Sequence, residues 1–159
     1  MTVKAPPTPL AKPVADSHPL AVPGLFSPVV APDQSFDALC GLELVDSDVP
    51  GRVQGRLKLR EELRARAGGL HGGVVAAVAE SLASRGTWIG LGDPSQRVMG
   101  LSNDTNHLSP LDGGHLNALA IVRERGRTQW LWEVQSRDDE RRLCALTIVT
   151  IAVRAARPA

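Results

Sequence analysis

Hydrophobic positions change their period along this chain, and the change separates one helical segment from several extended ones. Residues 72 to about 90 carry small and branched apolar side chains around almost the whole helical circumference, which predicts one long helix buried on most sides. Gly90, Gly92 and Pro94 predict where this helix ends. Four later segments have the length and composition of strands: residues 97–107, 115–125, 127–137 and 142–154.

Two of these strands also indicate which faces they bury. In residues 127–137, Trp130, Trp132 and Val134 share one face, which places both tryptophans in the core or in an interface. Residues 142–154 are apolar on both faces. Because only one helix is available to cover the sheet, the second apolar face needs another partner, and self-association is the simplest one.

Prolines and glycines divide the segment that precedes the helix. Nine of the twelve prolines fall within the first fifty residues, and eight of these interrupt any helix or strand ladder in residues 1–33. We therefore expect an extended, proline-rich tail over residues 1–33 and a folded domain over residues 34–159. Within this domain Ser35 is a candidate N-cap for a short helical turn, and residues 41–46 and 51–59 are strand candidates.

The order of these elements is two strands, a buried helix and then four strands. It predicts an α+β fold in which an antiparallel sheet wraps around one long central helix. A chain of 159 residues suffices for one such domain. Its hydrophobic fraction of 43% and aromatic fraction of 3% predict a mostly aliphatic core.

Composition narrows the function classes. A net charge of +1 gives no reason to expect a nucleic-acid partner, and no apolar run is long enough to span a membrane. The N-terminal segment lacks the pattern of a secretion signal, so we expect a cytoplasmic protein. Cys40 and Cys144 form no CxxC motif, which predicts two buried, reduced thiols and no metal site.

The candidate chemistry lies at the start of the long helix. His71-Gly72-Gly73 opens it, and Glu80 is the only charged residue between His71 and Ala83. A helix N-terminus offers unsatisfied N–H groups that suit an oxyanion or a polarised carbonyl. A lone carboxylate on an apolar helix is expensive to bury without a partner, which favours a chemical role. Together these groups fit acyl transfer or hydrolysis.

Several further stretches complete a recognisable pattern. They are Leu70-His71-Gly72-Gly73, Ala79-Glu80-x-Leu82-Ala83-Ser84, Ser102-Asn103-x-Thr105, Pro110-x-x-x-Gly114-His115, Trp130-Leu131-Trp132, Arg137-Asp138-Asp139, Arg142-Leu143-Cys144-Ala145 and Ile151-Ala152-Val153-Arg154. Over about residues 41–157 the chain resembles the hotdog-fold acyl-CoA thioesterases. Among them it is most similar to the 4-hydroxybenzoyl-CoA thioesterases of the soil-actinobacterial type and the related phenylacetyl-CoA thioesterases, which implies a place in the degradation of aromatic compounds.

The resemblance implies roles for particular residues. Glu80 falls on the family's nucleophile or general base, and the N–H of Gly72 falls on the group that holds the thioester carbonyl. His71 would orient the loop and substrate, and Ser84 would help to hold the carboxylate or water. The remaining substrate or CoA contacts that the resemblance implies are Gly73, Asn103, Thr105, Arg127, Thr128, Arg154 and Arg157. No cofactor is implied, since CoA is part of the substrate.

Two positions depart from the family pattern. Many relatives carry Gln or Asn six residues before the histidine, where this chain has Ala65. An arginine that touches CoA in the similar enzymes is Ser109 here. The identity of the acyl group therefore stays open among 4-hydroxybenzoyl, phenylacetyl and hydroxynaphthoyl groups.

Spacing along the helix predicts a shared site. Gly72 and Glu80 are eight residues apart, which is roughly 12 Å along a helix axis. One thioester carbon cannot meet both groups of the same helix. If both are catalytic, each site combines two subunits, so we expect at least a homodimer, and the doubly apolar sheet favours a dimer of dimers.

Simpler interpretations stay open for most of these residues. Glu80 could pair with Arg85 or with an arginine across an interface, and His71 could serve only as a helix cap. Ser84 could be a plain packing residue of the helix, and Arg127, Arg154 and Arg157 could be solvated surface charges. Asn103 and Thr105 could form hydrogen bonds with backbone groups at the sheet edge. His107 and His115 are interpreted as structural. Two further functions are a hotdog dehydratase, whose His–Asp or His–Glu pattern is absent, and a non-catalytic acyl-CoA sensor, which the presence of Glu80 disfavours.

Overall fold

The computed structural model describes residues 31–45, 47 and 49–155. Most of the predicted tail over residues 1–33, together with the candidate CoA contact Arg157, lies outside these residues. The described elements follow the predicted order. They are η1 (Pro32–Gln34), α1 (Phe36–Cys40), β1 (Leu42–Val45), β2 (Arg52–Lys58), η2 (Glu61–Leu63), α2 (Gly72–Leu91), β3 (Gln96–His107), β4 (His115–Arg125), β5 (Gln129–Arg137) and β6 (Leu143–Ala155).

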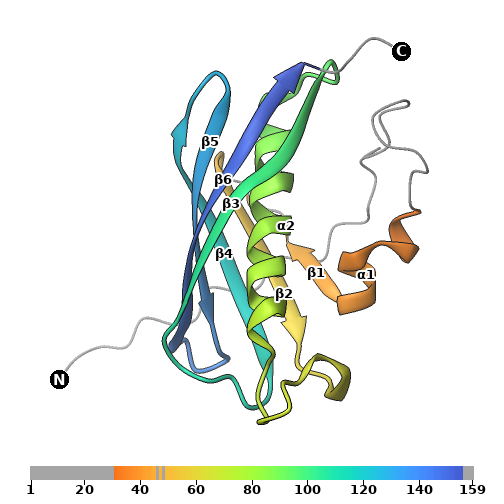
Figure 1. Cartoon of the computed structure of the whole chain (residues 1–159), viewed down its shortest axis with the longest axis vertical. Helices are drawn as coiled ribbons and strands as arrows, with labels where there is room; N and C mark the ends of the chain where they lie inside the picture. Colours follow the sequence, from red (N-terminus) through yellow and green to blue (C-terminus); the bar gives the residue numbers. More distant parts are fainter. Residues whose placement is uncertain (1–30, 46, 48, 156–159) are drawn as a thin grey trace, which may run out of the picture.

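Six antiparallel strands form one sheet in the order β1-β2-β4-β5-β6-β3, and α2 lies across one of its faces (Figure 1). The predicted α+β fold with a long central helix is confirmed. Strand β3 follows α2 in the chain but pairs with β6 at the sheet edge opposite β1. The helix therefore connects the two sides of the sheet, and β3 runs alongside it.

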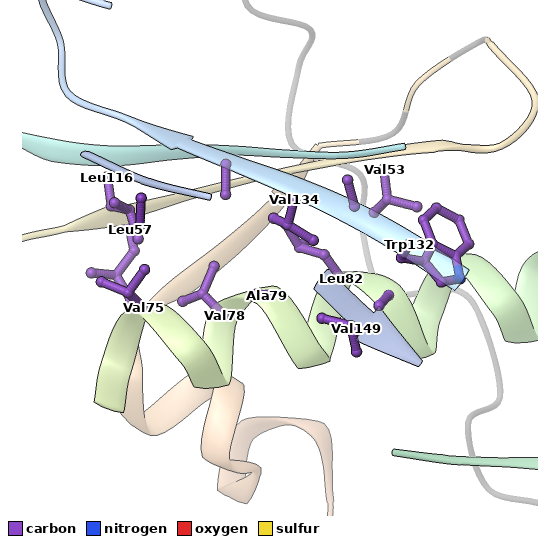
Figure 2. Close-up of a cluster of buried hydrophobic side chains, with 14 of the residues drawn as sticks. Val53, Leu57, Val75, Val78, Ala79, Leu82, Leu116, Trp132, Val134 and Val149 are labelled. Atoms are coloured by element: carbon purple, nitrogen blue, oxygen red, sulfur yellow. The ribbon is translucent and has the colours of Figure 1, made fainter. Parts of the chain in front are cut away.

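Alternate residues of the strands point toward α2 and form the core. Figure 2 shows Val53 and Leu57 of β2, Leu116 of β4, Trp132 and Val134 of β5, and Val149 of β6 facing Val75, Val78 and Leu82 of the helix. This period of two is the one that the sequence predicts for residues 127–137, whose Trp130, Trp132 and Val134 are all buried. Both cysteines are buried and unbridged, as expected.

The helix is less enclosed than its composition predicts. In the single chain α2 buries one side against the sheet, whereas Ala76, Ala77 and Ser84 are half-buried and Glu80 is exposed. The prediction of a helix buried on most sides is therefore wrong for one chain. Small side chains on the open side leave room for another surface to approach closely. No helix of the described residues is long and apolar enough to cross a membrane.

A short helix flanks this open side. Ser35 caps α1 by accepting a hydrogen bond from the N–H of Ala38 at 3.2 Å, which confirms the predicted N-cap. The hydroxyl of Ser81 donates to Asp37 of α1 at 2.6 Å. This bond ties α1 to α2 directly beside Glu80.

The C-terminal half of α2 packs closely on the two tryptophans, which lie in the core. Trp132 is fully buried, and its indole N–H donates to the hydroxyl of Thr87 at 2.8 Å. Gly86 faces the same ring so closely that a β-carbon built on it would overlap with Trp132 and lie 2.9 Å from a methyl group of Val53. Gly86 therefore allows the backbone of the helix to approach the sheet.

We predict that Gly86→Ala destabilises the fold. Alanine improves helix propensity by roughly 1 kcal/mol, but overpacking a rigid tryptophan typically costs about 1–3 kcal/mol. Chemical denaturation should show a lower free energy of unfolding. Gly113→Ala is the matched control, because a β-carbon there meets nothing within 4 Å, and its stability should change by no more than about 0.5 kcal/mol. Equal stability of the two variants would contradict the close approach.

Candidate active site

The start of α2 is held by hydrogen bonds on both sides. The N–H of His71 donates to Leu63 O at 2.8 Å, and the N–H of Leu70 donates to Leu111 O at 2.8 Å. His71 is the N-cap residue, and its Nδ1 accepts the N–H of Gly73 at 3.0 Å. The capping role that was one interpretation of His71 is thus present in the structure. Nδ1 must be unprotonated in order to accept this bond.

The N–H of Gly72 is the free donor of this helix start among the residues that the structure describes. Because it is the first residue of α2, its N–H has no partner within the helix. The bonds above engage His71 and Gly73, and no acceptor for Gly72 N occurs among the residues that the structure describes. The positive end of the helix dipole adds to this free donor. The geometry suits the oxygen of a polarised carbonyl.

His107 lies directly against Gly72. A β-carbon built on Gly72 would lie 2.8 Å from Nε2 of His107, the last residue of β3. Sequence reasoning interpreted His107 as structural and missed its place beside the helix start. The two residues are 35 positions apart, so no local spacing connects them. The signal would have been the alternation of β3, in which Asn103, Thr105 and His107 share one face.

An apolar cavity of about 430 Å³ adjoins Gly72. Its polar boundary includes His107 and Ser109, and Ser109 is the position where the family resemblance leads us to expect an arginine. Burial and then the negative charge of Asp138 raise the pKa of the Cys144 thiol, which keeps this wall uncharged at neutral pH. The apolar lining consists of Leu70, Val75, Leu108, Pro110, Leu111, Leu116 and Cys144.

Glu80 lies two turns further along α2 and faces β3. A β-carbon built on Gly100 would lie 2.5 Å from Oε1 of Glu80 and 2.9 Å from its Cδ. The Glu80 carboxylate therefore lies against Gly100, where any residue with a β-carbon would crowd it. Among the described residues Glu80 has neither an ion-pair partner nor a hydrogen-bond partner. It is exposed and available for chemistry.

The helix is continuous between the two candidate groups. Gly72 and Glu80 both belong to α2 (Gly72–Leu91), so their axial separation remains roughly 12 Å. Ser84 is half-buried one turn after Glu80 on the same open side. Within one chain, then, Glu80 and Ser84 are neighbours and Gly72 is separate from both.

Asn103 and Thr105 face the helix and bond within the chain. Asn103 Nδ2 donates to Ala76 O at 2.9 Å, and the hydroxyl of Thr105 donates to Asn103 Oδ1 at 2.8 Å. Thr105 also contacts the hydroxyl of the fully buried Thr147 at 3.1 Å. These bonds connect the edge strand to the helix between Gly72 and Glu80.

The candidate CoA contacts gather at the other end of α2. Arg154 donates to Thr128 O at 2.7 Å, and it lies directly opposite Arg97 across β6 and β3. Arg127 is exposed in the preceding turn. Trp130, two residues after Thr128, packs near Gly90 at the end of the helix. The arginines are therefore distant from the Gly72 of their own chain.

Ala65 occupies the position where the family resemblance leads us to expect Gln or Asn. It is half-buried, and its N–H donates to Gly69 O at 3.0 Å. Its methyl group offers no hydrogen bond to a substrate. Throughout the described part of the chain, no group of three or more His, Cys, Asp or Glu side chains is arranged to hold a metal ion.

Comparisons with known proteins identify the family of this chain. Residues 67–145 match the model of the thioesterase superfamily. The 1,4-dihydroxy-2-naphthoyl-CoA hydrolase of Listeria monocytogenes is 32% identical over 114 residues, which are 72% of this chain and 91% of that protein. The chain belongs to the thioesterase superfamily.

Solved structures show the same superfamily fold. A thioesterase from Haemophilus influenzae superimposes with a TM-score of 0.73 at 24% identity, covering 84% of this chain and 97% of that one. A variant thioesterase from Pseudomonas aeruginosa superimposes with a TM-score of 0.73 at 27% identity, covering 77% and 88%. The hotdog fold is thus established, and hydrolysis is the superfamily's reaction class.

We predict that Gly100→Ala lowers kcat by about 10²-fold, because a displacement of about 1 Å of a reacting group has effects of that size. The clash involves only the flexible end of Glu80, so the free energy of unfolding should change by no more than about 0.5 kcal/mol. Steady-state kinetics and denaturation test both parts.

A double variant isolates the cause. In a Glu80→Gln background, Gly100→Ala should reduce kcat no further, because both changes act on one carboxylate. Additive losses in the double variant would show that Gly100 acts in some other way.

Proposed function

We propose that this protein hydrolyses an acyl-CoA thioester to the free acid and CoA. The observation that carries the proposal is the pair of groups on α2, a carboxylate and an N–H beside an apolar cavity, neither of which has a partner in the described part of the chain. Membership of the thioesterase superfamily supports a hydrolase. The identification of the thiol as CoA is supported by the Listeria relative, which is named as a CoA-thioester hydrolase.

The proposed reaction starts with the thioester oxygen on the N–H of Gly72. Glu80 then either attacks the carbonyl carbon, forming a mixed anhydride that water cleaves, or removes a proton from the water that attacks. In both routes the C–S bond breaks and the thiolate leaves. Since a thiol has a pKa of about 8.5, no strong general acid is needed. Ser84 would hold the carboxylate or the water, and His71 would keep the helix start in place.

We further propose that two subunits build each site. The separation of Gly72 and Glu80 along one helix requires Glu80 to come from a partner if both groups act on the same carbonyl. Two features of the single chain support such a dimer. Strand β3 is twelve residues long and has an unpaired edge among the described residues, with Met99 and Leu101 exposed. The open side of α2 lies beside this edge.

A dimer of dimers is also proposed. Leu146 and Ile148 of β6 point away from the helix and are only half-buried in one chain. Covering this outer face of the sheet would bury them.

The proposed acyl group is compact and largely apolar. The cavity beside Gly72 has the size of a site for a small molecule and is lined mostly by aliphatic side chains. The name of the Listeria relative places an aromatic, fused-ring acyl group in its substrate. We therefore expect an aryl or similarly compact acyl group.

The proposed site for the CoA phosphates is the arginine group near the end of α2. Arg97 and Arg154 lie directly opposite each other, and like charges in that position repel unless an anion lies between them. Arg127 and Thr128 adjoin this pair, and Arg157 would follow it in sequence. In the proposed assembly, these residues of one subunit would bind the phosphates of a CoA ester whose carbonyl lies at Gly72 of another subunit.

We predict that Glu80→Gln lowers kcat by at least about 10²-fold, the lower range for a positioned general base. Thiol release from a panel of aryl- and alkyl-CoA esters measures this loss and identifies the preferred acyl group. Glu62→Gln, on the exposed η2 segment, is the matched control and should retain full activity. Tight binding of acyl-CoA without Glu80-dependent turnover would refute hydrolysis and favour a sensor.

Subunit complementation tests the shared site. Gly72→Pro removes the N–H, and proline is well accepted at the first position of a helix. Its β-carbon also requires a shift of the His107 ring, so complementation by the second variant, rather than the loss of activity alone, is the readout. Each of Gly72→Pro and Glu80→Gln should be inactive alone. In mixed dimers half of the assemblies are hybrid and each has one intact site of two, so activity should return to about a quarter of wild type. Failure of the mixture to regain activity, with hybrids present by mass spectrometry, would refute a site built from two subunits.

A further inference from the structure

A row of three hydrogen bonds crosses from the core of the sheet to the helix. Thr147 of β6, Thr105 and Asn103 of β3, and the carbonyl of Ala76 in α2 follow one another at 3.1, 2.8 and 2.9 Å. Thr147 is fully buried, and Thr105 and Asn103 are half-buried. The row ends at the helical turn between Gly72 and Glu80.

The direction of every bond in this row is fixed by chemistry. The carbonyl of Ala76 can only accept, so Asn103 must turn its NH₂ toward the helix and its oxygen toward Thr105. Thr105 has one hydroxyl hydrogen, and the oxygen of Asn103 uses it. The hydroxyl of Thr147 must therefore donate to Thr105. Bonds that run in one direction polarise one another, which holds Asn103 in a single orientation.

The receiving carbonyl belongs to the turn that carries Glu80. In a regular α-helix the N–H of residue 80 donates to the carbonyl of residue 76. Asn103 and the amide of Glu80 thus share the same acceptor. A second donor at this carbonyl anchors the backbone of Glu80 to β3.

An irregularity in β3 aligns these contacts. The register with β6 shifts between Gly100 and Ser102, which leaves Leu101 as an extra residue. Gly100 is opposite Ile151, and Asn103 is opposite Val149, and both partners are buried residues of the helix-facing side. The bulge therefore allows Gly100 to face Glu80 while Asn103 faces Ala76. A regular strand would place these two residues on opposite faces.

We propose that Asn103, oriented by Thr105 and Thr147, is a positioning residue for Glu80. It acts through the backbone of α2 and fixes where the carboxylate meets Gly100. This inference rests on the proposed function of Glu80, and it gives Asn103 and Thr105 a role other than the substrate contact implied by family resemblance.

The test compares kcat, KM and thermal stability of four variants against wild type, with an acyl-CoA that the panel shows to be hydrolysed. Asn103→Ala and Thr105→Val should each lower kcat about 10- to 100-fold, as for a displaced catalytic group. KM should stay within about twofold, because no substrate contact is lost. Thr105→Ser keeps the hydroxyl and should restore kcat. Thr87→Val removes a buried hydroxyl that bonds Trp132 elsewhere on α2, so it should lower the melting temperature and leave kcat unchanged.

Each alternative outcome has a distinct meaning. Wild-type kcat in Asn103→Ala or Thr105→Val would overturn the positioning role. So would an equal loss of kcat in Thr87→Val, or a failure of Thr105→Ser to restore activity, because both would show a general structural effect. A rise in KM without a fall in kcat would assign Asn103 to substrate binding and refute positioning. Absence of Glu80-dependent turnover in wild type would instead refute the proposed function itself.

Discussion

The separation of two chemical groups on one rigid helix is the constraint on which the rest of the structure depends. Gly72 and Glu80 belong to the same uninterrupted α2, roughly 12 Å apart along its axis. A helix cannot fold back to bring them together, so a thioester that needs both must lie between two helices. The single chain has the features that such a pairing requires: an open helix side of small residues and a long edge strand beside it.

The sheet forms the core, and its edge strand β3 also holds α2 in position. Strand β3 contacts α2 at three successive places, through His107 at Gly72, through Asn103 at Ala76 and through Gly100 at Glu80. At the other end of the helix, Gly86 and Trp132 permit close packing that fixes the distance between the layers. The chemistry of the helix is therefore set by contacts that lie mostly outside it.

Periodicity alone predicts most of this fold. The alternation in residues 127–137 identifies the buried tryptophans, and the small-residue pattern after residue 72 identifies α2, since each depends on neighbours in sequence. Burial of the helix was predicted incorrectly because small apolar residues have the same pattern whether the second surface belongs to the same chain or to another. The alternation within β3 signals the face of His107, but the Gly72–His107 contact also depends on the edge position of this strand. The Glu80–Gly100 pair could not be predicted, because it depends in addition on a bulge that shifts the facing of β3 by one residue.

The most direct measurement is a crystal structure of the assembled protein with a non-hydrolysable aryl-CoA thioether ketone, whose carbonyl stands in for that of the thioester. We predict that the carbonyl oxygen accepts a hydrogen bond from Gly72 N of one subunit, with the Glu80 carboxylate of a second subunit beside the carbonyl carbon. A carbonyl bound with no Glu80 near it, or one held by groups of a single chain, would contradict a site built from two subunits.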